Sequence, residues 1–302
     1  MLSSVRALRA MDESELLDRA LERAAQFLAY GTTMIEAKSG YGLDLESELK
    51  ILRVIKRLGE QSPLDVVPTF LGAHEIPPEF RNDREGYLKL ICERMIPAVA
   101  DEGLAEFCDV FCESHVFSVD ESRRVLEAGA RHGLAPKIHA DQLARTGGTR
   151  LACEIGAVSV DHADYADEED IAALADGKTI ATLLPGCVFH LGLTHQPPAR
   201  AMIDAGAAVA LATDFNPGSA PSLSIPMTLA LACNNLRMTP AEALAAATIN
   251  GAFAMRRADR AGSIEPGKQA DLVVLALEDE RLIPYHFGMR PVRMTIKNGE
   301  IV

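Results

Sequence analysis

Apolar and polar positions along most of the chain alternate between the spacing of helices and the spacing of strands. Residues 12–30 place their apolar side chains on one helical face, and Asp12 and Glu15 form a start that resembles a capping box. A short apolar β-type run follows at residues 32–37, and a second capped amphipathic segment follows at residues 44–59. The pattern therefore predicts a chain that opens on a helix and continues as strand and then helix.

Further strand candidates are apolar runs, each bounded by a helical or polar stretch. Several of them, such as residues 207–212, are apolar on both faces, which is typical of strands in a parallel sheet covered by helices. Together with residues 32–37 they make seven βα units. The candidates are residues 65–73, 106–114, 135–140, 157–163, 178–186 and 207–214.

Seven βα units predict an α/β fold, a TIM-like (β/α)8 barrel whose first strand is missing, because a closed barrel of this kind needs eight strands. A doubly wound open sheet would accept seven strands. Its first unit should then carry a Gly-rich phosphate-binding turn, which this sequence lacks. We therefore favour the barrel, over residues 1–258, and expect its first strand to lie upstream of Met1.

The pattern changes near the C-terminus. After helical stretches around residues 221–236 and 239–256, β-type runs appear at residues 270–276 and 292–301. They predict a small all-β appendage, half of a β-sandwich, over residues 259–302.

Composition and charge narrow the classes of protein. The 302 residues are 48% hydrophobic and 24% charged, which is ordinary for a globular chain. The formal net charge of −13, with no run of lysine and arginine long enough to make a phosphate-binding stripe, argues against a nucleic-acid partner. No apolar stretch approaches the roughly 18 residues that cross a bilayer, so we expect no membrane partner and a cytoplasmic location. The six cysteines are scattered and form no Cys-x-x-Cys pair, which favours buried thiols in a reducing compartment.

Polar side chains collect where the predicted strands end. In a (β/α)8 barrel the catalytic residues stand at the C-terminal ends of the strands. His74, His139, His162 and Asp214 all fall at such ends. Imidazole and carboxylate groups with an open position for water are what a hydrolytic zinc or iron ion requires. Each residue alone is also explained by structure: a strand-end histidine often makes a structural hydrogen bond, and aspartate before Asn-Pro-Gly is a turn former.

Weaker signals leave alternatives open. His190 and His195 flank a glycine in a loop, where a surface role and a role in a substrate lid are equally consistent with the sequence. Cys108 and Cys112 have the parity to face one way from a strand, but packing in the core is the better interpretation.

Short motifs are spread along the whole chain, mostly at the predicted strand ends. They read Lys38-Ser-Gly-Tyr-Gly-Leu, Phe70-Leu-Gly-Ala-His-Glu, Lys137-Ile-His-Ala-Asp-Gln, Val160-Asp-His, Thr213-Asp-Phe-Asn-Pro-Gly-Ser and Gly262-Ser-Ile-Glu-Pro-Gly-Lys-x-Ala-Asp-Leu. Together they resemble the motifs of the imidazolonepropionases, a family of the metal-dependent amidohydrolase superfamily. The last motif is common across that superfamily, whereas Ser-Gly-Tyr-Gly and Gly-Ala-His-Glu point to this family.

The resemblance implies a function. Enzymes of this family open the ring of 4-imidazolone-5-propanoate by hydrolysis of its cyclic amide, which gives N-formimidoyl-L-glutamate in histidine degradation. The implied cofactor is one divalent or trivalent metal ion per chain, zinc or iron. The expected partners are this small-molecule substrate and a second copy of the chain in a homodimer.

The resemblance also assigns roles to residues. His139 and Asp214 would be metal ligands, and Asp214 would take a proton from the metal-bound water. His162 would polarise the scissile carbonyl or shuttle the proton. The residues expected to contact substrate are Tyr41, His74, Gln142, His162, Asn216, Gly218 and Ser219.

Two departures from the family pattern affect these expectations. Some members have glutamate where this chain has Gln142, and a neutral amide can bind substrate but cannot act as a base. The His-x-His pair that ends the family's first strand, and a substrate-binding arginine just beyond it, are absent from the sequence. This agrees with the count of seven strands. It leads us to expect an N-terminally truncated version of a longer enzyme, with poor activity from Met1 onward.

Two other functions remain open on the sequence. A cytosine or guanine deaminase would share the barrel and the metal but release ammonia, although Ser-Gly-Tyr-Gly argues against it. A non-catalytic truncated barrel is the other alternative, and the missing His-x-His pair is its best support.

Overall fold

A computed structural model describes residues 2–302 and groups them into two structural units. The first unit contains residues 2–22 and Met34–Ala157, and the second contains Arg23–Thr33 and Val158–Val302. Helix α2 (Glu13–Ala29) contributes residues to both groups. The prediction that residues 1–258 and 259–302 are separate domains stays a prediction.

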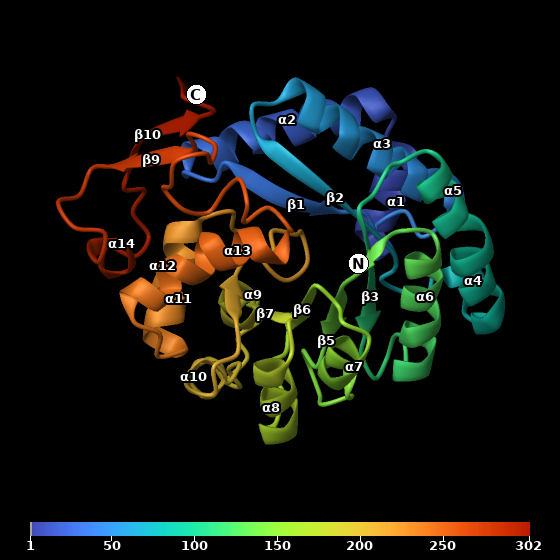
Figure 1. Cartoon of the computed structure of the whole chain (residues 1–302). Helices are drawn as coiled ribbons and strands as arrows, with labels where there is room; N and C mark the ends of the chain where they lie inside the picture. Colours follow the sequence, from blue (N-terminus) through green and yellow to red (C-terminus); the bar gives the residue numbers. More distant parts are fainter. Residues whose placement is uncertain (1) are drawn as a thin grey trace. The chain divides into compact units, whose positions relative to one another are not determined.

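The first unit repeats strand followed by helix, as the sequence pattern predicts (Figure 1). Its strands β1, β2, β3 and β5 pair in parallel in that order, and the short strand β4 also pairs with β3. Its elements are α1 (Leu2–Ala10), β1 (Met34–Lys38), α3 (Leu45–Gln61), β2 (Asp65–Ala73), η1 (Pro78–Phe80), α4 (Arg84–Leu90), η2 (Ile91–Met95), α5 (Ile96–Asp101), β3 (Phe107–Cys112), α6 (Val119–Arg131), β4 (Ala135–Pro136), β5 (Ile138–Ala140) and α7 (Gly148–Glu154).

Local sequence signals set where the helices of the first unit begin. Asp44 caps α3 by accepting a hydrogen bond from the Ser47 amide at 2.8 Å. Ser118 and Glu121 form a reciprocal capping box at the start of α6. The helices bury their apolar faces against the strands, where Phe70 on β2 is fully buried, and each such side chain contributes about 1.5–3 kcal/mol.

The second unit continues the strand and helix alternation and ends in a small sheet (Figure 1). Strands β6, β7 and β8 pair in parallel, and β9, β10 and β11 form an antiparallel sheet. Its elements are β6 (Ser159–His162), α8 (Glu168–Asp176), β7 (Ile180–Leu183), α9 (Pro185–His190), α10 (Ala199–Asp204), β8 (Val209–Leu211), α11 (Ile225–Asn235), α12 (Pro240–Ala247), α13 (Ile249–Ala254), β9 (Leu272–Leu275), α14 (Leu282–Tyr285), β10 (Val292–Lys297) and β11 (Glu300–Ile301).

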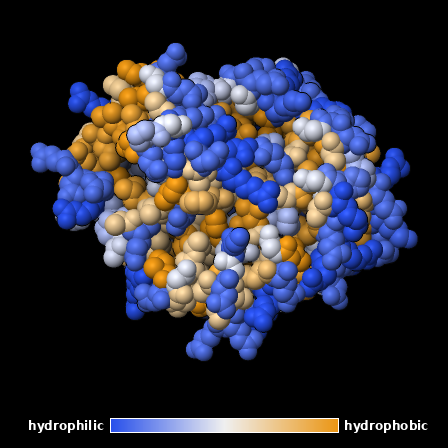
Figure 2. All heavy atoms as spheres, in the orientation of Figure 1, coloured by the Kyte–Doolittle hydropathy of each residue, from blue (hydrophilic) through white to orange (hydrophobic). Residues whose placement is uncertain are grey.

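The antiparallel sheet is fixed to the segment that precedes β1. The hydroxyl of Thr295 on β10 donates a hydrogen bond to the carbonyl oxygen of Leu28 at 2.6 Å. Gly31 adopts a φ of +86°, which strains any side chain, and a Cβ there would lie only 3.1 Å from Val273 and Val292, so the sheet packs closely on this glycine. The sheet keeps an apolar outer surface. Figure 2 shows hydrophobic atoms gathered where Figure 1 places β9 and β10, and Val274, on the face of β9 opposite to Val273, is 40% exposed.

The structure confirms the predicted strands and corrects several boundaries. Each of the seven predicted strand segments contains a strand. The segment 135–140 is split into β4 and β5 at Lys137, and β7 stops before Pro185, which begins α9. The predicted helix 239–256 breaks at Thr248 into α12 and α13. Helix α1 was not predicted.

The cysteines differ in burial, and the helices differ in length and apolar content. Cys108 and Cys112 are buried, as expected, but Cys92, Cys153 and Cys233 are partly exposed, so burial of all the thiols is wrong. Within residues 2–302, no helix is both long and apolar enough to span a membrane.

Candidate active site

Charged side chains from several strands of the first unit pair with one another. Lys137, whose side chain is 1% exposed, donates to Glu36 on β1 with an Nζ to Oε2 distance of 2.6 Å. The other oxygen of Glu36 accepts a hydrogen bond from the Thr69 hydroxyl and lies 3.3 Å from Lys38 Nζ. Buried charges cost several kcal/mol each unless they are paired and hydrogen-bonded. These strands therefore place Lys38, at the end of β1, in a fixed position.

His139 on β5 is oriented by a buried carboxylate. Its Nδ1 lies 3.1 and 3.0 Å from the two carboxylate oxygens of Asp109 on β3, and Lys38 Nζ lies 2.7 Å from Oδ2. Burial raises the pKa of Asp109, but the charges of His139 and Lys38 outweigh burial and hold the pKa below its usual value. An ionised carboxylate can only accept, so Nδ1 donates. The second ring nitrogen, Nε2, is then the one suited to bind a metal ion.

His74, at the end of β2, is a neutral imidazole with a defined tautomer. Its Nδ1 lies 2.9 Å from the carbonyl oxygen of Gly40, which can only accept, so Nδ1 carries the proton. Burial and the nearby charge of His139 lower the pKa of His74 to about 4. At neutral pH, Nε2 of His74 is therefore a hydrogen-bond acceptor. The ring of Tyr41 meets it edge-on, with centroids 5.3 Å apart.

Aromatic rings connect these two histidines. Phe111 on β3 meets His74 edge-on with a centroid distance of 6.0 Å, and it meets His139 in the same manner at 6.3 Å. The structure therefore brings Tyr41, His74 and His139 into one cluster at the strand ends of the first unit. Gln142 is also buried, in the turn that follows β5.

The turn after β5 is held by Asp141, whose φ is +52°. One carboxylate oxygen of Asp141 accepts hydrogen bonds from the amides of Thr146 and Gly147, and the other accepts from the amide of Thr149. Asp141 is thus a structural residue that fixes the turn carrying Gln142.

The strand ends of the second unit carry a buried histidine and two buried acids. His162 ends β6 with a φ of +77°, and Asp161 accepts a hydrogen bond from the Ser159 hydroxyl at 3.0 Å. Oδ1 of Asp164 is buried and has no hydrogen-bond partner among the described residues. Burial and the charge of Asp214 raise the pKa of Asp164 to about 7. An acid with this environment is typical of a functional site.

The loop after β8 is organised around Asn216. The side-chain nitrogen of Asn216, Nδ2, donates to the Asp214 carbonyl oxygen at 2.7 Å and to the Ser219 hydroxyl at 2.9 Å. Its side-chain oxygen accepts from the amides of Gly218 and Ser219, each at 2.8 Å. The Ser219 hydroxyl also reaches the Asp214 carboxylate at 3.3 Å. The structure therefore gathers Asp214, Asn216, Gly218 and Ser219 in one loop, with Asn216 as its internal support.

The two loop histidines differ. His190 is exposed at the end of α9. His195 is exposed as well, but its Nε2 donates to the Asp164 carbonyl oxygen at 2.8 Å, and its ring stacks on Tyr165 with centroids 4.0 Å apart. His195 thus ties its loop to the end of β6. The choice between a surface role and a lid stays open.

Sequence reasoning missed Asp109 and Asp164. Asp109 is the lone charged residue in the apolar run Phe107–Cys112, and a buried acid in a strand needs a partner, so a signal was present. Asp164 follows His162 by two positions in a polar strand end. The catalytic, metal-binding and substrate-binding roles assigned to residues from the sequence stay predictions.

Solved structures show which fold class the two units belong to. A 5-methylcytosine deaminase from Klebsiella pneumoniae, liganded with 5-fluorocytosine, matches 100% of this chain and 79% of its own with a TM-score of 0.80 and 14% identity. An adenosine deaminase from Xanthomonas campestris with bound zinc matches 97% of this chain and 70% of its own, with a TM-score of 0.73 and 20% identity. The fold is therefore a TIM-like barrel, as predicted, with a small C-terminal antiparallel sheet.

Sequence comparison defines the family. The profile of the Amidohydrolase family matches residues 2–302. The imidazolonepropionase of Geobacillus thermodenitrificans (strain NG80-2) is 52% identical over 300 residues, which are 99% of this chain and 70% of that protein. That of Shouchella clausii (strain KSM-K16) is 49% identical over 302 residues, 100% of this chain and 67% of that protein. The chain therefore belongs to the imidazolonepropionases of the amidohydrolase family, as its motifs indicate.

Proposed function

We propose that this protein hydrolyses the cyclic amide of 4-imidazolone-5-propanoate to N-formimidoyl-L-glutamate, a step of histidine degradation. The observation that carries the proposal is the identity of about half of all positions with imidazolonepropionases over 99% of the chain. The distinctive motifs lie where substrate residues belong in this fold, since Tyr41 and His74 meet at the ends of β1 and β2.

We propose that one metal ion, zinc or iron, is held by His139 and Asp214. The donor chemistry fits, because Asp109 fixes the His139 proton on Nδ1 and so presents Nε2 as a ligand. A second sign of fit is the buried Asp164 Oδ1, which lacks a hydrogen-bond partner among the described residues and lies in the field of Asp214. When bound, such an ion polarises a carbonyl group and makes water a better nucleophile at neutral pH.

Asp214 and His162, both in the second unit, transfer the protons. In ring opening, water adds its oxygen to the amide carbon, the carbon–nitrogen bond breaks, and the ring nitrogen gains a proton. Asp214 takes the proton that the attacking water gives up, and Ser219 keeps the Asp214 carboxylate in place. His162 polarises the scissile carbonyl or shuttles the proton to the leaving nitrogen.

Substrate binding uses residues from the motifs that follow β1, β2, β5 and β8. Because Nδ1 of His74 is engaged by Gly40, Nε2 of the neutral ring accepts a hydrogen bond, which suits a ring N–H of the substrate. The Tyr41 hydroxyl donates to a substrate oxygen. The remaining proposed contacts are made by Gln142, Asn216, Gly218 and Ser219.

Product analysis tests the proposed function. The purified chain is incubated with 4-imidazolone-5-propanoate while ring absorbance, ammonia and N-formimidoyl-L-glutamate are followed. Ring loss that yields the formimidoyl product without ammonia supports the proposal. Ammonia release from a free base such as cytosine would instead support a deaminase, and a chain inert toward both would support a non-catalytic barrel.

We also propose that the protein forms a homodimer and works in the cytoplasm. The exposed apolar surface formed by Val274 on β9 and Ile301 on β11, which lie on the same face of the sheet, supports an interface between copies. Sedimentation analysis of the protein and of a Val274→Lys variant tests this. A monomer at micromolar concentration in both would contradict it.

A further inference from the structure

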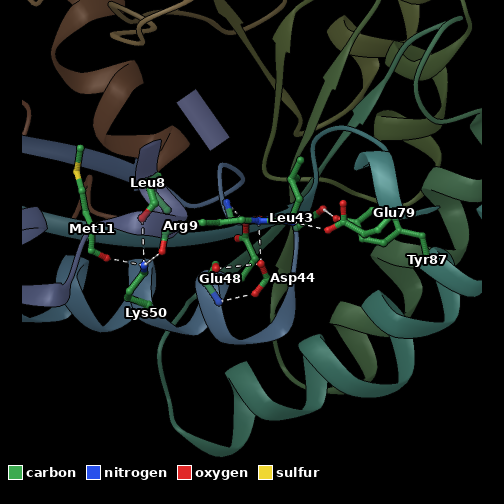
Figure 3. A network of polar contacts seen from close by, with 12 residues as sticks. Leu8, Arg9, Met11, Leu43, Asp44, Glu48, Lys50, Glu79 and Tyr87 are labelled. Carbon is green, nitrogen blue, oxygen red and sulfur yellow. Dashed lines mark hydrogen bonds and ion pairs between the residues drawn. The ribbon is translucent and has the colours of Figure 1, made fainter. Parts of the chain in front are cut away.

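A fully buried carboxylate stands in the first turns of α3, and no role has been assigned to it. Glu48 has 0% exposure and lies within the polar network shown in Figure 3. Its Oε1 accepts hydrogen bonds from the amides of Gly42 and Leu43, both at 2.8 Å, and its Oε2 accepts from the Gly40 amide at 2.9 Å. Three backbone donors from one loop thus converge on one side chain.

Burial of this acid is costly unless the loop satisfies it. Burial raises the pKa of Glu48 above its usual value, and hydrogen bonds from the Ser39 hydroxyl and from the amides of Gly40, Gly42 and Leu43 offset only part of that rise. An isolated carboxylate in an apolar interior would change its charge rather than stay ionised. Glu48 and the loop 39–43 therefore form one unit, in which the carboxylate holds the loop and the loop's donors stabilise the carboxylate.

The loop fits closely between β2 and α3. Gly40 has a φ of +100°, and a Cβ there would lie 2.7 Å from the Leu71 carbonyl oxygen. A Cβ at Gly42 would lie 2.7 Å from the Glu48 amide nitrogen. Ser39 Oγ accepts a hydrogen bond from the Leu71 amide at 2.9 Å. Both glycines of the Ser-Gly-Tyr-Gly motif are thus needed for close approach of the backbone, and Tyr41 is the member that can reach a ligand.

The same loop sets the tautomer of His74. Gly40 donates its amide to Glu48 and accepts the His74 Nδ1 proton on its carbonyl oxygen at 2.9 Å. Tyr41, the next residue, places its ring edge-on to the imidazole. A displacement of Gly40 would therefore break the hydrogen bond that keeps the proton of His74 on Nδ1. It would move Tyr41 at the same time.

We propose that Glu48 is a positioning residue that, through the loop 39–43, locks His74 in the Nδ1–H tautomer and holds Tyr41 beside it for substrate binding. The assignment of Tyr41 and His74 to substrate rests on the proposed function. The effect of Glu48 on the loop and on the His74 tautomer does not.

The variant Glu48→Gln breaks this arrangement with almost no change in volume. The amide oxygen of glutamine can keep the two donors of Gly42 and Leu43, but its NH2 group then faces the Gly40 N–H, which it cannot accept. We expect KM for imidazolone-propanoate to rise about 10-fold, as for a buried donor left without its acceptor, with kcat changed less than about 3-fold.

Lys50→Met is the matched control. Lys50 lies on the same helix and in the same network, where its Nζ donates to the carbonyl oxygens of Leu8, Arg9 and Met11 (Figure 3). Its loss should lower Tm and leave KM unchanged. Equal KM values in Glu48→Gln and Lys50→Met would show that Glu48 contributes only stability and would overturn the proposal.

Nuclear magnetic resonance of 15N-labelled histidine provides a readout that needs no substrate. In the wild type, His74 should show a protonated Nδ1 and an unprotonated Nε2, and Glu48→Gln should shift both resonances toward a mixture of tautomers. Failure of the proposed function would appear as absent turnover with this shift intact. An unchanged His74 tautomer in Glu48→Gln would overturn the inference itself.

Two further variants keep the test decisive. If Glu48→Gln does not fold, Ser39→Ala removes one partner of the carboxylate and should produce the same tautomer shift to a smaller extent. If Glu48 acts through His74, the double variant Glu48→Gln with His74→Ala should have the KM of His74→Ala alone. Additive increases in KM would contradict an action through His74.

Discussion

The loops after β1 and β8 both carry motifs of the family, but they are held in different ways. The loop 39–43 is held from outside by Glu48, which lies on the following helix and shares no motif with it. The loop 213–219 is held from inside, because Asn216 satisfies the backbone of its own turn. A motif is therefore sufficient to explain the geometry of the second loop, while the first depends on a residue that only the fold identifies.

The largest effect is expected in the internally supported loop. Asp214→Asn should lower kcat by at least about 100-fold, as is typical when a general base is lost, while substrate still binds. Asp176→Asn, at an exposed position at the end of α8, is the matched control and should leave kcat unchanged. Steady-state kinetics and a binding titration measure both. Turnover retained in Asp214→Asn would show that Asp214 is not the base.

The next largest effect is expected at His74, whose tautomer is fixed by the loop 39–43. His74→Ala should raise KM by about 10- to 100-fold because the substrate loses a buried hydrogen-bond partner, and the metal content per chain should not change. Metal analysis of the purified variant is the decisive measurement. If the alanine variant loses its metal while Asp214 is intact, His74 is a ligand and the assignment to substrate is wrong.

A smaller effect tests whether the second loop supports itself. Asn216→Ala removes hydrogen bonds to Asp214, Gly218 and Ser219, so it should release the Asp214 backbone. We expect kcat/KM to fall about 10-fold and the free energy of unfolding to fall by about 1–3 kcal/mol. A crystal structure of the variant with the loop unchanged would show that Asn216 does not support it.

The last effect concerns the dependence of stability on pH and leaves activity at neutral pH unchanged. His74 titrates with a pKa of about 4 in the folded protein and 6.5 as a free side chain, so folding favours its neutral form. Its contribution to stability is therefore complete above the unfolded value and is lost as the pH falls from 6.5 toward 4. Tm measured across that range should fall more steeply in the wild type than in His74→Gln. Parallel curves would indicate that His74 has an ordinary pKa.

The parallel strands were predictable because strands covered by helices on both sides are rich in apolar residues, and the sequence shows a largely apolar run at each of the seven predicted positions. The exceptions have long-range causes. Lys137, between β4 and β5, pairs its ammonium group with Glu36, which lies 101 residues earlier. Helix α1 is short, and Lys50 on α3 binds the carbonyl oxygens near its end, so its own sequence gave little indication of it.

The same distinction applies to the candidate site. Strand-end histidines and Asp214 stand out because polar residues there interrupt apolar runs. Asp109 and Glu48 act on those residues from other elements, through contacts with His139 and with Gly40. Glu48 follows other acids in the first turn of α3, where acidic residues are favoured in any helix, so the sequence contains no signal for its role.

The most direct test of the account is the identity of the product formed by the 302-residue chain from 4-imidazolone-5-propanoate. Mass spectrometry detects product independently of how fast it forms, and Asp214→Asn supplies the background. The account predicts N-formimidoyl-L-glutamate, without ammonia, above that background. Ammonia release, or no formimidoyl product above the Asp214→Asn background, would contradict it.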